Sequence, residues 1–338
     1  MAALTNSLSL TEKISQFYSR EKKYPPAKAF VELLDQDNSI LNLVPTLEAN
    51  NITSHEYNQR VALPTVASRL AGAGTAQSKS ETVRQTSHIK IYSSLMKIDK
   101  ESFELGGSGK EYVASEMRAH MSAQDIKIAS EMFYGSTTDI TRIAGIANTY
   151  NALSGNIADN VISAGSVSGS DAMSVWIIGL GGNGLNFTYP MGSPAMGFSR
   201  TSSSEWNPET DTNSKTRFVM FNEFVINRGI VVPDWRSCVR VCNIDKSVLM
   251  ADTTGATINL ATLIIKAYSR LPSKSITGVK SYEVFMNRSA FEALQTQMYN
   301  KSNAAFSYSE IEGKTVYQIN GLKINVIDAL ISTESTVS

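Results

Sequence analysis

The stretch of sequence that decides the fold is residues 108–135, SGKEYVASEMRAHMSAQDIKIASEMFYG. Ser108 and Glu111 have the spacing of a capping box, so a helix is expected to begin here. The side chains of one helix face then recur every three or four residues: Val113, Met117, Met121, Gln124, Ile128 and Met132. Gly135 ends the pattern, as glycine commonly does after a last helical turn. The sequence therefore predicts a helix of about 26 residues, about 39 Å long, lying across a sheet.

A long hairpin is expected on the N-terminal side of this helix, between Ile52 and Lys100. Its strands would be residues 55–63 and 81–98, and the tip, residues 67–80, is rich in Gly, Ala and Ser. An isolated two-stranded ribbon is marginally stable in water. Because these strands also carry few large apolar side chains, the hairpin needs a surface to lie on, and a neighbouring subunit is the simplest one.

Basic residues outnumber acidic residues on this hairpin. Between Ile52 and Lys90 there are five basic residues and two acidic residues, Glu56 and Glu81, so the net charge is five minus two, or +3. A solvated strand face explains this modest excess as well as a specific electrostatic contact does. Our hypothesis is that four of the basic residues contact a neighbouring subunit: Arg60, Arg69, Lys79 and Arg84.

Residues 1–51 have the pattern of an arm with two short helices. Ser9 and Glu12 form a second capping box, and the two prolines Pro25-Pro26 separate the first helix from the second. Two short amphipathic helices form no core of their own. The arm is therefore expected to bury its apolar faces against something else.

Strand and helix patterns are mixed after the long helix. Strands are expected at residues 175–180, 218–226, 230–244, 282–286, 314–319 and 322–326. Asn227-Arg228-Gly229 is expected to be a hairpin turn between two of these strands, and Asn320-Gly321 to join the last two. Thr257 is expected to cap a helix that ends at Pro272, and residues 291–298 belong to a further helix.

Composition excludes several classes of protein. The chain has 338 residues, of which 42% are hydrophobic and 18% charged, as in an ordered protein with a substantial core. The 31 basic and 31 acidic residues cancel, which removes the charge signal of a dedicated DNA or membrane binder. Two cysteines make no disulfide framework, and no apolar run approaches the roughly 18 residues that span a bilayer. The N-terminus lacks the pattern of a secretory signal, so an unexported soluble chain is expected.

One glycine-rich motif suggests an alternative function. Residues 179–184, GLGGNG, match the GxGxxG pattern of dinucleotide-binding folds and follow an apolar strand. Residues 186–190, NFTYP, cannot begin the helix whose amide groups would bind the phosphates. We therefore favour a turn between strands over a soluble nucleotide-binding enzyme.

The remaining reactive side chains form no recognisable site. Cys238 and Cys242 lie on one expected strand, about 13 Å apart, which is too far to share a metal ion. No Cys, Asp or Glu at ligand spacing accompanies the three histidines, His55, His88 and His120. No catalytic residue, metal ligand or cofactor is therefore expected.

A polar and aromatic cluster stands out at residues 234–236. It consists of Asp234, Trp235 and Arg236. We interpret it as structural, through an internal salt bridge or a subunit contact, in preference to catalysis.

The order of these elements resembles the major capsid protein of tailed double-stranded DNA bacteriophages, which has the Hong Kong 97-type fold. Five stretches are similar to one branch of this family: LDQDNSIL at 34–41, VALPTVASR at 61–69, IVVPDWR at 230–236, VRVCNID at 239–245 and FMNRS at 285–289. The resemblance covers roughly residues 27–330. It implies an α+β fold with an N-terminal arm, an extended β-hairpin loop, a long spine helix, and peripheral and axial domains.

The resemblance also implies how the chain is divided and what it does. Residues 1–51 would be the arm, 52–107 the extended loop, 108–135 the spine helix and 136–338 the peripheral and axial domains. The subunit would assemble with itself into hexamers and pentamers of an icosahedral head that encloses double-stranded DNA without sequence-specific binding.

Further partners and locations follow from the same resemblance. Scaffolding, portal and decoration proteins would be partners, and no membrane would be involved. Assembly would occur in the host bacterial cytoplasm, and the final location would be the virion. A cellular encapsulin-like nanocompartment shell protein shares the fold and is the main alternative.

Overall fold

The computed structural model describes most of the chain after residue 39. The described residues are 40–105, 109–155, 157–165, 167, 169–202, 205–210, 214–301, 306–311 and 314–338. They divide into two compact units. Unit 1 contains Ile91–Lys127 and Gly197–Ile226, and unit 2 contains residues 40–90, Ile128–Met196 and Asn227–Ser338. The two helices expected in residues 1–51 and the capping residue Ser108 lie outside the described residues.

Unit 1 contains a small antiparallel sheet. Its central strand, β10 (Thr216–Val231), pairs with β8 (Phe198–Ser202) and β9 (Asn207–Thr210). Strand β4 (Lys90–Asp99) also neighbours β10, and it is followed by the short helix α3 (Lys100–Leu105). The side chains of β4 alternate between buried and exposed along Ile91–Ile98, which is the pattern of a sheet with one covered face.

Helix α4 (Gly109–Tyr134) confirms the long helix that the sequence predicts. Its residues Val113 and Met117 pack against the buried side chains of the unit 1 sheet, Met96, Ile98 and Phe224. Gln124 lies on the same helix face and donates a hydrogen bond of 2.9 Å to the carbonyl oxygen of Phe224. This bond explains why an amide occupies an apolar position. The last turns of the helix, from Ile128, belong to unit 2.

The expected hairpin turn at Asn227-Arg228-Gly229 is wrong. Strand β10 runs without interruption from Thr216 to Val231, and Gly229 lies opposite Thr188 of strand β7 (Asn186–Tyr189). A β-carbon at Gly229 would lie 2.6 Å from the side-chain oxygen of Thr188. The glycine therefore allows two strands to approach closely and does not form a turn.

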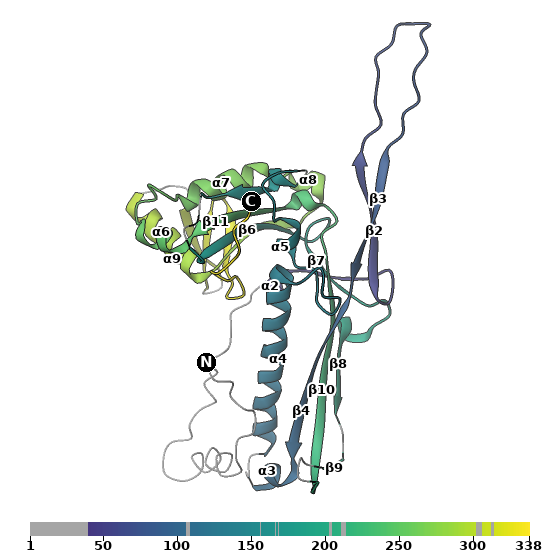
Figure 1. The fold of residues 1–338 in the computed structure, drawn as a ribbon, viewed down its shortest axis with the longest axis vertical. Helices are drawn as coiled ribbons and strands as arrows, with labels where there is room; N and C mark the ends of the chain where they lie inside the picture. The colour runs from purple at the N-terminus through teal and green to yellow at the C-terminus, as the bar shows by residue number, and fades with distance from the viewer. Residues whose placement is uncertain are drawn as a thin grey trace. The chain divides into compact units, whose positions relative to one another are not determined.

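The expected long hairpin is present in unit 2 as an isolated strand pair. Strands β2 (Ser54–Ala62) and β3 (Glu81–His88) are antiparallel, with Ser54 opposite His88 and Arg60 opposite Thr82. They lie side by side at the base of the purple ribbon in Figure 1. The second expected strand, residues 81–98, is in fact two strands, because β3 ends at His88 and β4 begins at Lys90 in a different sheet.

A seven-stranded mixed sheet forms the body of unit 2. The strand order is β13-β14-β15-β12-β6-β11-β5. Their bounds are β5 (Val161–Ser163), β6 (Ala172–Leu180), β11 (Cys238–Asp245), β12 (Ser281–Met286), β13 (Phe306–Ile311), β14 (Lys314–Ile319) and β15 (Leu322–Val326). All residues of β6 and β11 are buried. The final hairpin confirms the prediction, because Asn320 and Gly321 join β14 to β15 with positive φ angles of 50° and 77°.

Both faces of this sheet are covered, which is why its central strands are continuously apolar. On one face Val175 and Ile177 pack with the helices α7 (Leu260–Arg270) and α9 (Arg288–Lys301) in the main core. On the other face Trp176 contacts Phe133, near the end of α4, and Tyr150. The core of unit 2 therefore has three layers.

The remaining elements are short. They are α2 (Ile40–Leu43), β1 (Thr46–Glu48), α5 (Ile146–Thr149), η1 (Ala158–Asn160), η2 (Pro194–Gly197), η3 (Trp235–Ser237), α6 (Lys246–Ala251) and α8 (Lys274–Thr277). The expected helix cap at Thr257 is wrong: Asn259 caps α7 by accepting a 3.1 Å hydrogen bond from the amide of Thr262, and the Thr257 amide bonds to Asp252. Within the described residues no helix is long and apolar enough to cross a membrane.

Candidate assembly site

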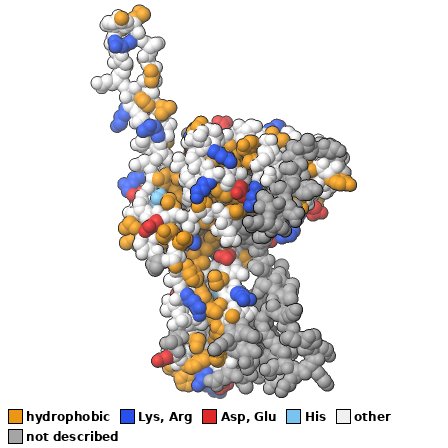
Figure 2. Space-filling view, turned by 180° about the vertical axis from the view of Figure 1, so that it is seen from behind, with side chains coloured by type: hydrophobic (Ala, Val, Ile, Leu, Met, Phe, Trp, Pro, Cys, Tyr) orange, Lys and Arg blue, Asp and Glu red, His pale blue; other side chains and the backbone are white. Residues whose placement is uncertain are grey.

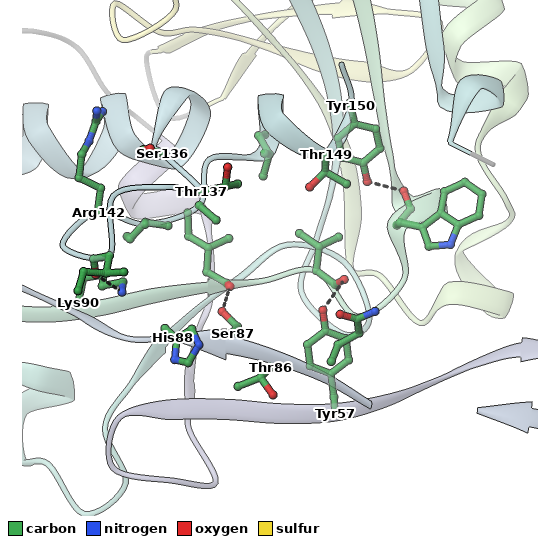
Figure 3. Close-up of a pocket in the computed structure, with 18 of the residues that line it drawn as sticks. Tyr57, Thr86, Ser87, His88, Lys90, Ser136, Thr137, Arg142, Thr149 and Tyr150 are labelled. Atoms are coloured by element: carbon green, nitrogen blue, oxygen red, sulfur yellow. Dashed lines mark hydrogen bonds between the residues drawn. The ribbon is translucent and has the colours of Figure 1, made fainter. Parts of the chain in front are cut away.

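Side chains at the base of the β2–β3 hairpin attach it to residues 230–233, at the end of β10 and just after it. The Tyr57 hydroxyl donates to the carbonyl oxygen of Val232 at 3.5 Å, and the Gln59 amide donates to that of Pro233 at 2.6 Å. The Ser87 hydroxyl donates to the carbonyl oxygen of Ile230. Figure 3 shows Tyr57 and Ser87 pointing from the hairpin towards these residues. The base is thus held by side-chain bonds to backbone carbonyls and not by a strand ladder.

A pocket of about 610 Å³ lies beside these contacts. The hairpin base, the loop after α4 and residues 230–235 line it (Figure 3). Its charged groups are already engaged: Arg142 pairs with Glu131 at 3.1 Å, and Lys90 donates to the carbonyl oxygen of Ile140. The described residues contain no group of three His, Cys, Asp or Glu side chains placed to hold a metal ion. The pocket therefore offers packing and hydrogen-bonding surface.

The structure separates the four basic residues of the hairpin into two kinds. Arg60, Arg69 and Lys79 are exposed, and Arg69 donates a 2.6 Å hydrogen bond to the carbonyl oxygen of Ala73 within the tip. Arg84 instead forms an ion pair with Glu56 across the two strands. Arg84 thus has an acidic partner in its own hairpin although its side chain is 66% exposed, whereas Arg60, Arg69 and Lys79 form no ion pair among the described residues.

The distal hairpin also exposes large apolar side chains, which sequence reasoning missed. Leu63 is 77% exposed, Val66 is 95% exposed and Leu70 is 84% exposed. We call these three residues the apolar tip. Figure 2 shows hydrophobic and basic side chains together at this end of the hairpin. Single exposed apolar residues are common on proteins, but three on an isolated ribbon indicate a surface that is covered in an assembly.

A second apolar surface lies on the sheet of unit 1. Ile91 and Leu95 lie on one face of β4 and are 72% and 53% exposed. We call these residues the sheet stripe; Figure 2 shows hydrophobic side chains exposed in this part of the molecule. Nearby, the Lys97 ammonium lies 5.3 Å from the centre of the Phe221 ring and pairs with Glu209 at 2.5 Å. The hydrogen bond from Lys97 lowers the pKa of Glu209. The stripe thus has a charged rim, as protein interfaces commonly do.

The cluster at residues 234–236 forms an internal ion pair. Asp234 accepts a 3.0 Å hydrogen bond from the backbone amide of Arg236 and pairs with its guanidinium at 2.9 Å. Trp235 is only half-buried, and its carbonyl oxygen accepts a 2.5 Å hydrogen bond from the Tyr150 hydroxyl. These contacts fix the chain between β10 and β11 and provide no catalytic arrangement.

The glycines of residues 179–184 allow backbone segments to pack closely against one another. A β-carbon at Gly182, where φ is 58°, would lie 2.0 Å from the carbonyl oxygen of Gly278. A β-carbon at Gly184 would lie 2.2 Å from the carbonyl oxygen of Gly179. Strand β7 follows the turn, where a dinucleotide-binding fold would have a helix. The motif therefore lacks the geometry of a phosphate site.

The cysteines and histidines lie apart, and none belongs to a ligand set within the described residues. Cys238 and Cys242 are buried, and burial raises the pKa of each thiol to about 11. Burial also lowers the pKa of His55, whose ring stacks on that of Tyr57. His120 in α4 hydrogen-bonds to Ser94 of β4.

Sequence reasoning also missed a buried ion pair between Arg240 and Glu334. The Arg240 guanidinium lies 2.8 Å from the Glu334 carboxylate, and both side chains are almost completely buried. The available signal was a single arginine in the apolar run Cys238–Cys242, because a buried charge needs a partner. Nothing in the sequence indicated which acidic residue that partner would be.

Comparisons with known proteins identify the family. A family model for the major capsid protein GP7 matches residues 25–338. The chain belongs to this family. This major capsid protein is thus a structural protein of the phage virion, where copies assemble with one another into the capsid. The alternative of a nucleotide-binding enzyme finds no support in the geometry of residues 179–184.

Solved structures show the fold of this major capsid protein. A chain in the structure of bacteriophage Epsilon15 aligns with a TM-score of 0.73 and 24% identity, covering 100% of this chain and 99% of that chain. The fold is therefore the Hong Kong 97-type fold that the sequence suggested. A chain from Mycobacterium phage Adephagia aligns with a TM-score of 0.47 and 8% identity over 67% of this chain and 92% of that chain. The SrpI encapsulin of Synechococcus elongatus PCC 7942 aligns with a TM-score of 0.45 and 9% identity, covering 70% of this chain and 97% of that chain. A comparison with curated proteins finds no match.

Proposed function

We propose that this major capsid protein assembles into hexamers and pentamers of an icosahedral head, in which the hairpin of each copy lies on the neighbouring copy. The observation that carries the proposal is the pair of exposed apolar surfaces, the apolar tip of the hairpin and the sheet stripe on unit 1. Each lacks cover in the described chain. A head-to-tail contact between the tip of one copy and the stripe of the next joins two different surfaces, and such contacts close into rings.

The hairpin has a physical reason to depend on a neighbour. Within the described residues the strands β2 and β3 belong to no larger sheet, and residues 61–79 are exposed. Complete burial of a Val or Leu side chain stabilises by about 1.5–3 kcal/mol. Covering the three side chains of the apolar tip therefore supplies about 5–9 kcal/mol before the entropy cost of association is subtracted. Arg60, Arg69 and Lys79 then provide orientation at the edge of the contact.

The parts of the chain take corresponding roles in this proposal. Residues 1–51 are the arm, residues 52–107 the extended loop, residues 108–135 the spine helix, and residues 136–338 the peripheral and axial domains. Asp234, Trp235 and Arg236 hold the segment on which the hairpin base rests. The protein needs no catalytic activity for this role.

Further partners belong to the same proposal. The head encloses double-stranded DNA, which a chain of net charge zero contacts without reading its sequence. Scaffolding, portal and decoration proteins act on the shell during and after its assembly in the bacterial cytoplasm.

The contact is tested by changing the tip while leaving its length intact. The triple variant Leu63→Ser, Val66→Ser, Leu70→Ser should remain a folded subunit and lose regular shells, as judged by circular dichroism and negative-stain microscopy. A matched control, Thr75→Ala with Gln77→Ala, changes exposed polar residues of the same tip and should assemble normally. Normal shells from the triple variant would show that the apolar tip is not the contact.

The acceptor surface is tested separately. Leu95→Asp places a charge in the sheet stripe, and it should abolish assembly without unfolding the subunit, because Leu95 is half exposed. Ser154→Asp changes an exposed residue outside both apolar surfaces and is the control for charge alone. Equal loss of assembly in both variants would refute a specific apolar contact at Leu95.

A further inference from the structure

The C-terminal residues 331–338 cross unit 2 without forming a regular strand. The backbone amide of Glu334 donates a 2.9 Å hydrogen bond to the carbonyl oxygen of Ala172, at the start of β6. The carbonyl oxygen of Ser338 accepts a 3.2 Å bond from the amide of Leu153. Glu334 and Val337 are buried, whereas the residues on either side of Glu334 are largely accessible. We call residues 331–338 the C-terminal strap.

Asn243 of β11 binds the backbone of the strap. Its side-chain amide donates a 2.8 Å hydrogen bond to the carbonyl oxygen of Val337, and its side-chain oxygen accepts a 2.8 Å bond from the Val337 amide. Asn243 has a φ of 56° and lies where the pairing of β11 with β6 shifts register, between Val241 and Ile244. Such bulges redirect side chains. Here the Asn243 side chain at the bulge binds the backbone of the strap.

The second anchor is the ion pair of Arg240, three residues earlier on the same strand. Its guanidinium bonds to Glu334 at 2.8 Å, to the Ser174 hydroxyl at 3.0 Å and to the carbonyl oxygen of Tyr150 at 2.8 Å. It also lies 5.3 Å from the centre of the Trp176 ring. The Glu334 carboxylate accepts further hydrogen bonds from Ser174 and from the hydroxyl of Tyr134.

These contacts make Glu334 the only acid that balances the buried charge of Arg240 among the contacts described for it. Removal of one member of a buried ion pair leaves an unpaired charge and is strongly destabilising. Tyr134 belongs to the last turn of α4, so the same carboxylate connects that helix end to β6 and β11. The strap also follows, in sequence, every element that it connects.

We infer that the C-terminal strap is a clasp that makes the subunit competent for assembly. Until residues 334–337 bind, Arg240 lacks the counter-charge of Glu334, and the end of α4 lacks the hydrogen bond from Tyr134 to that carboxylate. A chain that is broken off before residue 334 therefore carries the hairpin and the sheet stripe but is excluded from shells. The exclusion of truncated chains from shells rests on the proposed function. The contacts of the strap that explain this exclusion all lie within unit 2.

The test compares four variants with the full chain, by sedimentation of assembled particles and by the melting temperature and trypsin sensitivity of unassembled subunits. Deletion of residues 334–338 and the single substitution E334Q should each reduce the assembled fraction at least tenfold. Thr336→Ala changes an exposed strap residue and should have no effect. The double variant R240M/E334Q removes both charges while keeping hydrogen-bonding capacity at position 334, and it should recover assembly to within about threefold of the full chain.

Two results would overturn the clasp. One is a deletion variant that assembles within twofold of the full chain; the other is a double variant no better than E334Q alone. If the full chain and Thr336→Ala also fail to assemble, the proposed function fails, but the unassembled subunits still decide the clasp. In that case a melting temperature and trypsin pattern unchanged by the deletion would refute it.

Discussion

Replacement of Trp176 by alanine should cause the largest loss of stability of any single tryptophan substitution in unit 2. Trp176 is completely buried, and it packs edge-on against Tyr150 with ring centres 5.8 Å apart and against Phe133 at 6.0 Å. An aromatic side chain buries about 200 Å², which at about 25 cal/mol per Å² corresponds to about 5 kcal/mol. Trp to Ala substitutions in cores cost about 3–5 kcal/mol, so we expect a loss near the upper end.

Two further substitutions make this prediction specific. Trp176→Phe should cost less than about 2 kcal/mol, because it removes an indole N–H that has no hydrogen-bond partner among the described residues and whose burial is itself unfavourable. Trp235→Ala should cost about 1–2 kcal/mol, because that side chain is only half-buried. Urea unfolding of unassembled subunits, followed by far-ultraviolet circular dichroism, measures all three. A loss below about 1 kcal/mol for Trp176→Ala, or a larger loss for Trp235→Ala, would refute the reasoning.

Three other predictions concern the thiols, the acid response and the glycine turn. The thiols of Cys238 and Cys242 are buried and have pKa values of about 11. They should therefore react with a thiol reagent at pH 8 only after unfolding. Fast labelling of the native subunit would contradict their burial. Asp252 accepts backbone hydrogen bonds from Ile258, Ala256 and Thr257, and these bonds lower the pKa of its carboxyl group below the ordinary 3.8. Its stabilising effect is therefore present above pH 3.8 and is lost as the pH falls further. Asp252→Asn should flatten this acid limb of the curve of unfolding free energy against pH, and an unchanged limb would show that the bonds do not matter. Gly182→Ala should lower the melting temperature, because its β-carbon would lie 2.0 Å from the carbonyl oxygen of Gly278. Calorimetry with a dinucleotide should show no binding to the native protein. Saturable binding would support the nucleotide site.

Local signals in the sequence were sufficient where one segment determines its own structure. The spacing of Val113, Met117 and Ile128 predicted α4 because a helix face repeats every three or four residues. Asn320-Gly321 predicted the last hairpin because both residues adopt positive φ angles in that turn. The Asn227-Arg228-Gly229 prediction failed because the same residue types also serve close strand packing, and only the position of Thr188 distinguishes the two cases.

The candidate site was less predictable for a related reason. The sequence drew attention to basic residues of the hairpin, yet Arg84 pairs with Glu56 within the hairpin itself. The spacing of Leu63, Val66 and Leu70 is that of a helix face, yet the structure has no helix at these residues. A periodic pattern therefore could not reveal the apolar tip. Pairs such as Arg240 and Glu334 lie 94 residues apart, so their contact is set by the whole sheet and not by any local pattern.

The central claim, that copies of this chain build a shell through the hairpin, is tested most directly by negative-stain microscopy with light scattering of the expressed protein. The full chain should form closed particles, or rings of five and six. A chain lacking residues 67–80 should remain a folded subunit of about 36 kDa, slightly below the 36.8 kDa of the full chain. If the full chain remains a monomer, alone and with the proteins encoded beside it, self-assembly is contradicted. If the shortened chain builds regular shells, the role of the hairpin is contradicted.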